Sequence, residues 1–310
     1  MWSDLLLTAV LPGVVMVAYF HARNEYCTSR GLIQIAYVLG VLSPLLTLLL
    51  SGLLHHPSDP ADGIYWAAMN VSLFGAAIPE ELGKGAMVMA FVWLFRGSRE
   101  RPHDMVVLGA AVGAGFAANE NVLYLLRANT LWVETGILRA LMSVPGHVCW
   151  GAIMGALLAQ REVDDSPGWT AAAFGLPIVL HALYDFPLFV GYFARVTEVD
   201  DAEAIAAMLD NAALMVVLVE CAAAILVSAA VLRGERRNGM APATPSDLRQ
   251  DLVGGAAWIA LALVVGVGGV INALTLVENG ETFLLTLLPM LYAAAGLHLG
   301  YARLTAPVEA

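Results

Sequence analysis

The chain has 310 residues, of which 59% are hydrophobic and only 13% charged, and its mean hydropathy is +0.75. Soluble globular domains carry about 25% charged residues, so this composition excludes an ordinary soluble domain. The net charge is −11, and the sequence has no basic arm and no glycine-rich phosphate loop. We therefore expect an integral membrane protein whose first partner is the lipid bilayer, with no nucleic-acid or nucleotide partner.

The apolar residues lie in long runs, and a bilayer core needs about 20 such residues per helix. The pattern predicts an all-α, polytopic transmembrane helical bundle of about nine spans. Their expected limits are 4–22, 31–54, 64–95, 104–126, 136–160, 169–194, 208–232, 252–275 and 283–303. The third run is longer than one crossing needs, so we expect it to tilt or to break near Gly75 and Pro79. The pairs Gly109-x-x-x-Gly113 and Gly151-x-x-x-Gly155 predict close contacts between helices.

Arginine is distributed unevenly between alternate loops, and the side richer in lysine and arginine faces the cytoplasm. The richer side and the C-terminus hold Arg23, Arg30, Arg96, Arg99, Arg101, Arg161, Arg233, Arg236, Arg237, Arg249 and Arg303. The other loops and their flanks hold Arg127, Arg139 and Arg195. We therefore expect the N-terminus outside and the C-terminus in the cytoplasm.

Within the third span stands the sequence Pro79-Glu80-Glu81-Leu82-Gly83-Lys84. A charged side chain at the bilayer centre costs about 2.5–3.5 kcal/mol, so this cluster needs a reason. Helical spacing places Lys84 beside either glutamate, and one ion pair required for folding would explain one carboxylate. The second carboxylate would remain unpaired, and we interpret it as functional.

The next three spans each carry titratable groups. Glu120-Asn121 lies in the fourth span and His147 in the fifth, and in the sixth an i, i+4 spacing places His181 and Asp185 on one helical face. Such a pair can ligate a metal together, or the aspartate can fix the tautomer of the imidazole. A lone buried glutamate or histidine also occurs as a purely structural residue. Together, however, these groups and those of the third span fall at similar depths, which predicts one hydrated site.

Two further polar groups are left out of this site. Glu220 in the seventh span is isolated in the sequence, and we expect it to have a structural role. Cys149 lies beside His147, and we expect it to be a small buried residue rather than a reactive thiol.

Four motifs together resemble the PrsW family of intramembrane proteases, relatives of the CAAX prenyl protease and bacteriocin-processing superfamily. The matching motifs are Glu80-Glu81-x-x-Lys84, Phe116-x-x-x-Glu120-Asn121, His147 with Gly151 and Gly155, and His181-x-x-x-Asp185. The resemblance divides the chain into two first helices (1–63), a catalytic four-span core (64–195) and a C-terminal transmembrane extension (196–310). It implies a peptidase of the bacterial cytoplasmic membrane that cuts membrane-anchored proteins or peptides, such as anti-sigma factors or other signalling proteins.

In this resemblance Glu80 and Glu81 supply the general base with Lys84 beside them, and the site is completed by Glu120, Asn121, His147, His181 and Asp185. Two mechanisms stay open. In one, Zn²⁺ held by His147, His181 and a carboxylate such as Glu120 polarises the carbonyl. In the other, a glutamate and a histidine activate water without a metal.

Two other classes of function compete with a peptidase. The same buried groups could serve as a proton relay or as ion ligands in a transporter or channel. Many transporters carry an inverted repeat, and this sequence has none that we detect. A non-catalytic scaffold for membrane partners is the third class, and the unpaired carboxylates within the membrane argue against it.

Overall fold

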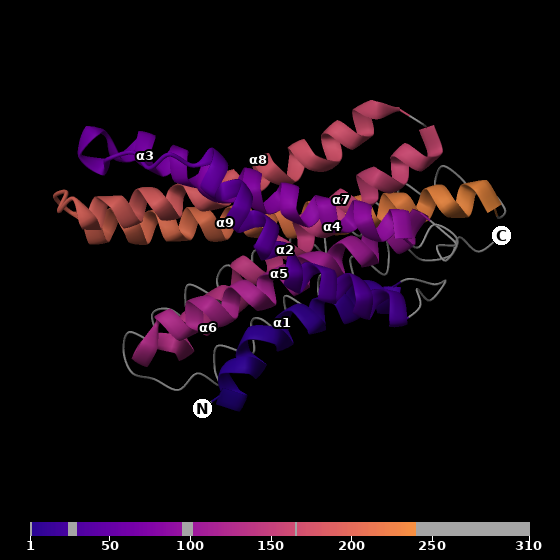
Figure 1. Ribbon diagram of the computed structural model, residues 1–310, viewed down its shortest axis with the longest axis horizontal. Helices are drawn as coiled ribbons and strands as arrows, with labels where there is room; N and C mark the ends of the chain where they lie inside the picture. Colours follow the sequence, from indigo (N-terminus) through magenta and orange to yellow (C-terminus); the bar gives the residue numbers. More distant parts are fainter. Residues whose placement is uncertain (1, 24–29, 95–101, 165, 240–310) are drawn as a thin grey trace, which may run out of the picture. The chain divides into compact units, whose positions relative to one another are not determined.

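The computed structural model describes residues 2–23, 30–94, 102–164 and 166–239, and these ranges contain helices and short turns but no strand (Figure 1). The elements are α1 (Trp2–Arg23), α2 (Arg30–Leu54), η1 (Pro60–Asp62), α3 (Ile64–Asn70), η2 (Val71–Ala77), α4 (Ile78–Leu94), α5 (Pro102–Arg127), η3 (Asn129–Leu131), α6 (Trp132–Leu141), α7 (Ser143–Asp164), α8 (Pro167–Val196) and α9 (Ala202–Gly239). The all-α class is thus confirmed. Residues up to Ala224 form one compact unit, which contains every contact discussed below.

Among the described residues, six helical stretches are long and apolar enough to cross a membrane. They are Asp4–His21, Arg30–Leu54, Asp104–Arg127, Trp132–Arg161, Pro167–Val196 and Ala202–Val231. They correspond to six of the predicted spans, whereas the predicted spans 252–275 and 283–303 lie outside the described residues. The total of about nine crossings and the orientation of the termini therefore stay predictions.

The remaining predicted span, 64–95, is helical but irregular. It consists of α3, a π-helical segment η2 in which the N–H of Ile78 donates to the carbonyl of Leu73, and then α4. Pro79 has no N–H and so leaves the carbonyl of Gly75 without its helical donor, and the hydroxyl of Ser51 on α2 donates to that carbonyl at 3.1 Å. The irregularity thus lies where the glycine and the proline predict it, directly before the two glutamates of α4.

Glycines hold α5 and α7 at very short range. A Cβ at Gly109 would meet the backbone oxygen of Gly151, and a Cβ at Gly113 would meet that of His147. A Cβ at Gly155 would likewise meet the carbonyl of Met105. The predicted small-residue contacts are therefore confirmed. Their consequence is that the backbone of His147 lies directly against α5, two turns before Glu120.

Candidate active site

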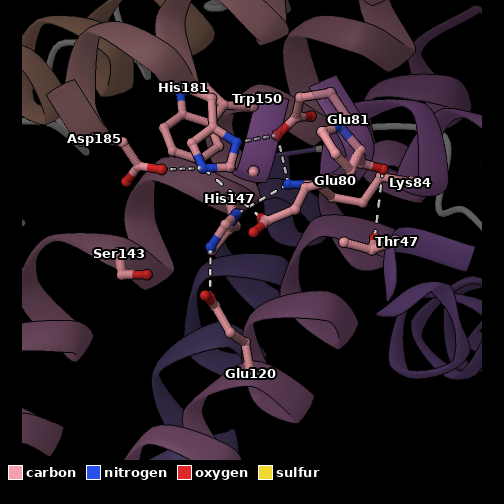
Figure 2. A network of polar contacts seen from close by, with 12 residues as sticks. Thr47, Glu80, Glu81, Lys84, Glu120, Ser143, His147, Trp150, His181 and Asp185 are labelled. Carbon is pink, nitrogen blue, oxygen red and sulfur yellow. Dashed lines mark hydrogen bonds and ion pairs between the residues drawn. The ribbon is translucent and has the colours of Figure 1, made fainter. Parts of the chain in front are cut away.

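The titratable side chains of four helices point into one buried cluster (Figure 2). α4 contributes Glu80, Glu81 and Lys84, α5 contributes Glu120, α7 contributes His147, and α8 contributes His181 and Asp185. The side chains of Glu81, Lys84, His147 and His181 are at most 3% exposed. Seven of the eight predicted site residues are thus brought together.

The ring of His147 lies between a cation and a carboxylate. Its Nδ1 is 3.0 Å from Nζ of Lys84, and its Nε2 is 2.9 Å from Oε2 of Glu120. A lysine ammonium is a donor only, so Nδ1 accepts from Lys84 and Nε2 carries the hydrogen that it donates to Glu120. The neighbours therefore assign one tautomer and one orientation to this imidazole.

The ring of His181 faces carboxylates at both nitrogens. Its Nδ1 is 2.9 Å from Oε1 of Glu81, and its Nε2 is 3.2 Å from Oδ2 of Asp185 and 3.8 Å from Oε2 of Glu80. An imidazole lone pair that faces a carboxylate oxygen is repelled, so one proton on the ring cannot satisfy both sides. A second proton or a bound cation must therefore lie between the ring and one of these carboxylates, and the carboxylates on both sides favour positive charge here.

The two neighbouring glutamates of α4 have different surroundings. Oε1 of Glu81 is 2.5 Å from Nζ of Lys84 and also contacts His181, so Glu81 is the carboxylate that neutralises the buried lysine. Oε2 of Glu80 is buried without a hydrogen-bond partner within the described chain, as is Oε2 of Glu81. Glu80 is therefore the surplus carboxylate that the sequence predicted, and each glutamate keeps one free acceptor atom.

Glu80, His147 and His181 can hold a metal ion together. Each offers one ligand atom, and these atoms lie within 4.8 Å of one another in a buried position. Two imidazoles and one carboxylate form the donor set of several catalytic zinc sites, and the free oxygen of Glu80 suits the third position. The carboxylate of this group is Glu80, whereas the sequence analysis expected Glu120 as the third ligand. Glu120 instead accepts the N–H of His147, which is the contact that usually orients a ligating histidine.

Arg139 is the principal site residue that sequence reasoning missed. It lies on α6, and its Nη2 donates to Oε2 of Glu120 at 2.5 Å and to the hydroxyl of Ser143 at 2.9 Å. Its Nε donates at 2.6 Å to Asn121, and its guanidinium lies 4.0 Å from the ring centroid of Tyr124. The sequence analysis counted Arg139 as the flank of an outer loop. The available signal was its spacing of four residues before Ser143 and eight before His147.

Asn121, the eighth predicted residue, lies one layer outside the cluster. Its amide nitrogen donates to the carbonyl of Ala9 on α1 at 3.2 Å, and its oxygen accepts from Arg139. Asn121 therefore ties Arg139 to α1 and does not face the histidines directly.

Replacing Arg139 with glutamine should lower the stability of the protein by about 3 kcal/mol, because the largely buried Glu120 loses its charged partner. Arg139→Lys should recover only part of this loss, since one ammonium cannot reproduce three directed bonds and the contact with Tyr124. The melting temperature of the purified protein in detergent measures both effects. If Arg139→Lys were as stable as the wild type, the three hydrogen bonds of the guanidinium would not contribute to stability.

Comparison with known proteins places this chain in a family. The model of the PrsW family of intramembrane metalloproteases matches residues 28–232. The protein is similar to the protease PrsW of Geobacillus kaustophilus, with 33% identity over 188 residues that cover 60% of this chain and 80% of the relative. It is also similar to those of Halalkalibacterium halodurans (29% over 185 residues, 59% and 82%) and Bacillus subtilis (27% over 188 residues, 59% and 82%). No solved structure gives a significant match. The matched region extends beyond the expected core of 64–195 and includes most of α9.

Proposed function

The chain belongs to the PrsW family of intramembrane metalloproteases, and we propose that it hydrolyses peptide bonds of membrane-anchored proteins at the group of Glu80, His147 and His181. It is a membrane-embedded peptidase. The observation that carries the proposal is the convergence of carboxylates and imidazoles from four helices in one buried cluster. Burying so many charged groups in a bilayer costs free energy, and a purely structural role would not require this many of them.

We assign the metal-binding role to Glu80, His147 and His181. Zn²⁺ held there would polarise the scissile carbonyl and acidify water. Glu120 and Asp185 would then orient the two imidazoles through the bonds that they accept from His147 and His181.

The general base is Glu81 in this proposal. Its Oε1 is held by Lys84, whereas its Oε2 has no partner among the described residues and can accept a proton from water. The hydroxide adds to the carbonyl carbon, and the proton passes from Glu81 to the leaving nitrogen as the peptide bond breaks. Lys84 has three N–H donors, and one of them pairs with Glu81. When Nδ1 of His147 binds the metal, the donor that Lys84 directs at this atom is released and can stabilise the negative charge on the carbonyl oxygen.

We further propose the setting of this reaction. The uneven arginine distribution supports about nine crossings with the N-terminus outside and the C-terminus cytoplasmic. The relatives are bacterial, and we place the protein in the bacterial cytoplasmic membrane. Membrane-anchored signalling proteins such as anti-sigma factors are the proposed substrates, as the resemblance of the four motifs implies.

Cleavage of a single-pass reporter protein by the purified enzyme in liposomes tests the proposal. Glu80→Gln should lower the cleavage rate by roughly 10²-fold or more, because the metal group loses its carboxylate ligand. Glu80 is a cleaner position than Glu81, whose substitution also leaves Lys84 without its carboxylate partner. Glu203→Gln is the matched control, since its side chain is 82% exposed on α9.

Two results would contradict the assignment. Unchanged cleavage by Glu80→Gln would reject the proposed site. A wild-type protein that cleaves no reporter but conducts a pH-driven flux, lost in Glu80→Gln, would favour the transporter class.

A further inference from the structure

Trp150 of α7 lies flat against His181. The two ring centroids are 4.2 Å apart and the planes differ by only 19° (Figure 2). The same indole meets the ring of His147 edge to face at 5.0 Å, and it is completely buried. One tryptophan therefore contacts both histidines of the candidate metal group.

The stacking restricts a rotation of the His181 ring that its hydrogen bonds still permit. Glu81 and Asp185 hold the two ring nitrogens, so the ring can still tilt about the line that joins these atoms. A flat aromatic surface against one face blocks that tilt. The plane of His181 is thus fixed only while the indole keeps its own orientation.

A glutamate on α9 fixes that orientation. The indole N–H of Trp150 donates to Oε2 of Glu220 at 2.8 Å, and Glu220 is 1% exposed. Its Oε1 has no hydrogen-bond partner among the described residues. α9 supplies the most apolar of the six candidate spans, so a carboxyl group there carries a substantial desolvation cost. An indole N–H alone needs only one acceptor, which a glutamine or serine would supply at lower cost.

Trp150 and Glu220 lie within the contact between α7 and α9. A Cβ at Gly146 would come within 2.9 Å of the Trp150 ring and 3.2 Å of Val217, so the glycine leaves the space that the indole and α9 occupy. Cys149 and Cys221 lie beside the pair with their sulfur atoms 3.3 Å apart. Each helix thus presents residues at i, i+3 and i+4 to the other, so the contact covers about one turn of each helix.

We propose that Glu220 and Trp150 act as one positioning pair, in which Glu220 orients the indole and the indole fixes the plane of His181. The part of α9 around Glu220 then supports the active site and is not an extension beyond it. The proposal rests on the proposed function, because it assigns a role relative to His181.

Cleavage kinetics and zinc affinity of single and double variants test the pair. Glu220→Met removes the acceptor at similar volume, and Trp150→Phe keeps a ring over His181 but removes the N–H. Each should lower kcat about tenfold with KM unchanged within about twofold, and should weaken zinc binding about tenfold in competition with a chromophoric chelator. Because the two residues act as a unit, the double variant should be no worse than the poorer single variant.

Conservative and control variants separate positioning from simple loss of fold. Glu220→Gln should restore near wild-type kcat and zinc affinity, since its amide oxygen can accept the indole N–H. Asp210→Asn makes the same change of charge on a half-exposed position of α9 and should leave both unchanged.

The outcomes distinguish the two proposals. Wild-type kcat and zinc affinity in Glu220→Met, with cleavage lost in His181→Ala, would overturn the positioning pair alone. Additive losses in the double variant would overturn it as well. Full activity of His181→Ala would instead reject the proposed active site on which the pair depends.

Discussion

The substitution His181→Ala is expected to remove both zinc retention and cleavage. The wild-type protein should carry about one zinc ion per chain, and the variant close to none, because a three-residue donor set that loses an imidazole keeps only two ligands. The same change leaves Glu81 and Asp185 facing an empty space in place of a ring. Cleavage should fall by about 10³–10⁴-fold. His147→Ala should behave in the same way, since His147 belongs to the same group.

Metal analysis of protein purified without chelators measures this prediction, alongside the reporter assay. His56→Ala is the control, because His56 lies in an exposed stretch after α2. Zinc retained by both histidine variants would show that the metal lies elsewhere. Full cleavage by wild-type protein stripped of zinc would support the metal-free mechanism, in which a carboxylate and an imidazole activate the water.

The sequence predicted those contacts of the site that a single helix determines. Lys84 stands three residues after Glu81 and Asp185 four after His181, and helical geometry alone brings each pair into contact. The choice between Glu80 and Glu120 as the third ligand could not be predicted in this way. It depends on how α4 and α5 are rotated about their own axes, and the glycine contacts with α7 fix this rotation for α5 alone.

The residues that support the histidines were the hardest to find from the sequence. Trp150 and Glu220 are 70 positions apart, and neither belongs to a recognisable motif. Glu220 was set aside because it is isolated along the chain, although a buried carboxyl in a very apolar helix is itself a signal. Arg139 was assigned to a loop flank because it lies near the start of the predicted span 136–160, and its contacts, which cross from α6 to α5, leave no pattern in the sequence. Isolation in sequence is thus a poor reason to exclude a charged residue from a membrane site.

The ion pair between Glu81 and Lys84 gives the second large effect, on stability. Lys84→Met should destabilise the protein by about 3–5 kcal/mol, because it leaves a fully buried carboxylate without its cation. Glu81→Met should cost a similar amount, since the ammonium would then keep only His147 as a partner. The double variant Glu81→Met/Lys84→Met should recover much of this loss, because both charges are removed together and the space is filled by apolar side chains.

Among these three variants, the cleavage rate should not change in parallel with the stability. The double variant lacks both the base and the oxyanion donor, so it should be as inactive as either single variant while its melting temperature rises toward that of the wild type. The exposed pair of Arg195 and Glu203 is the control, and its removal should change stability by less than about 1 kcal/mol. A double variant less stable than both single variants would mean that the two side chains contribute independently, which contradicts the predicted coupling. Recovery of stability without activity would mean that this buried charge pair is needed for the chemistry and adds little net stability to the fold.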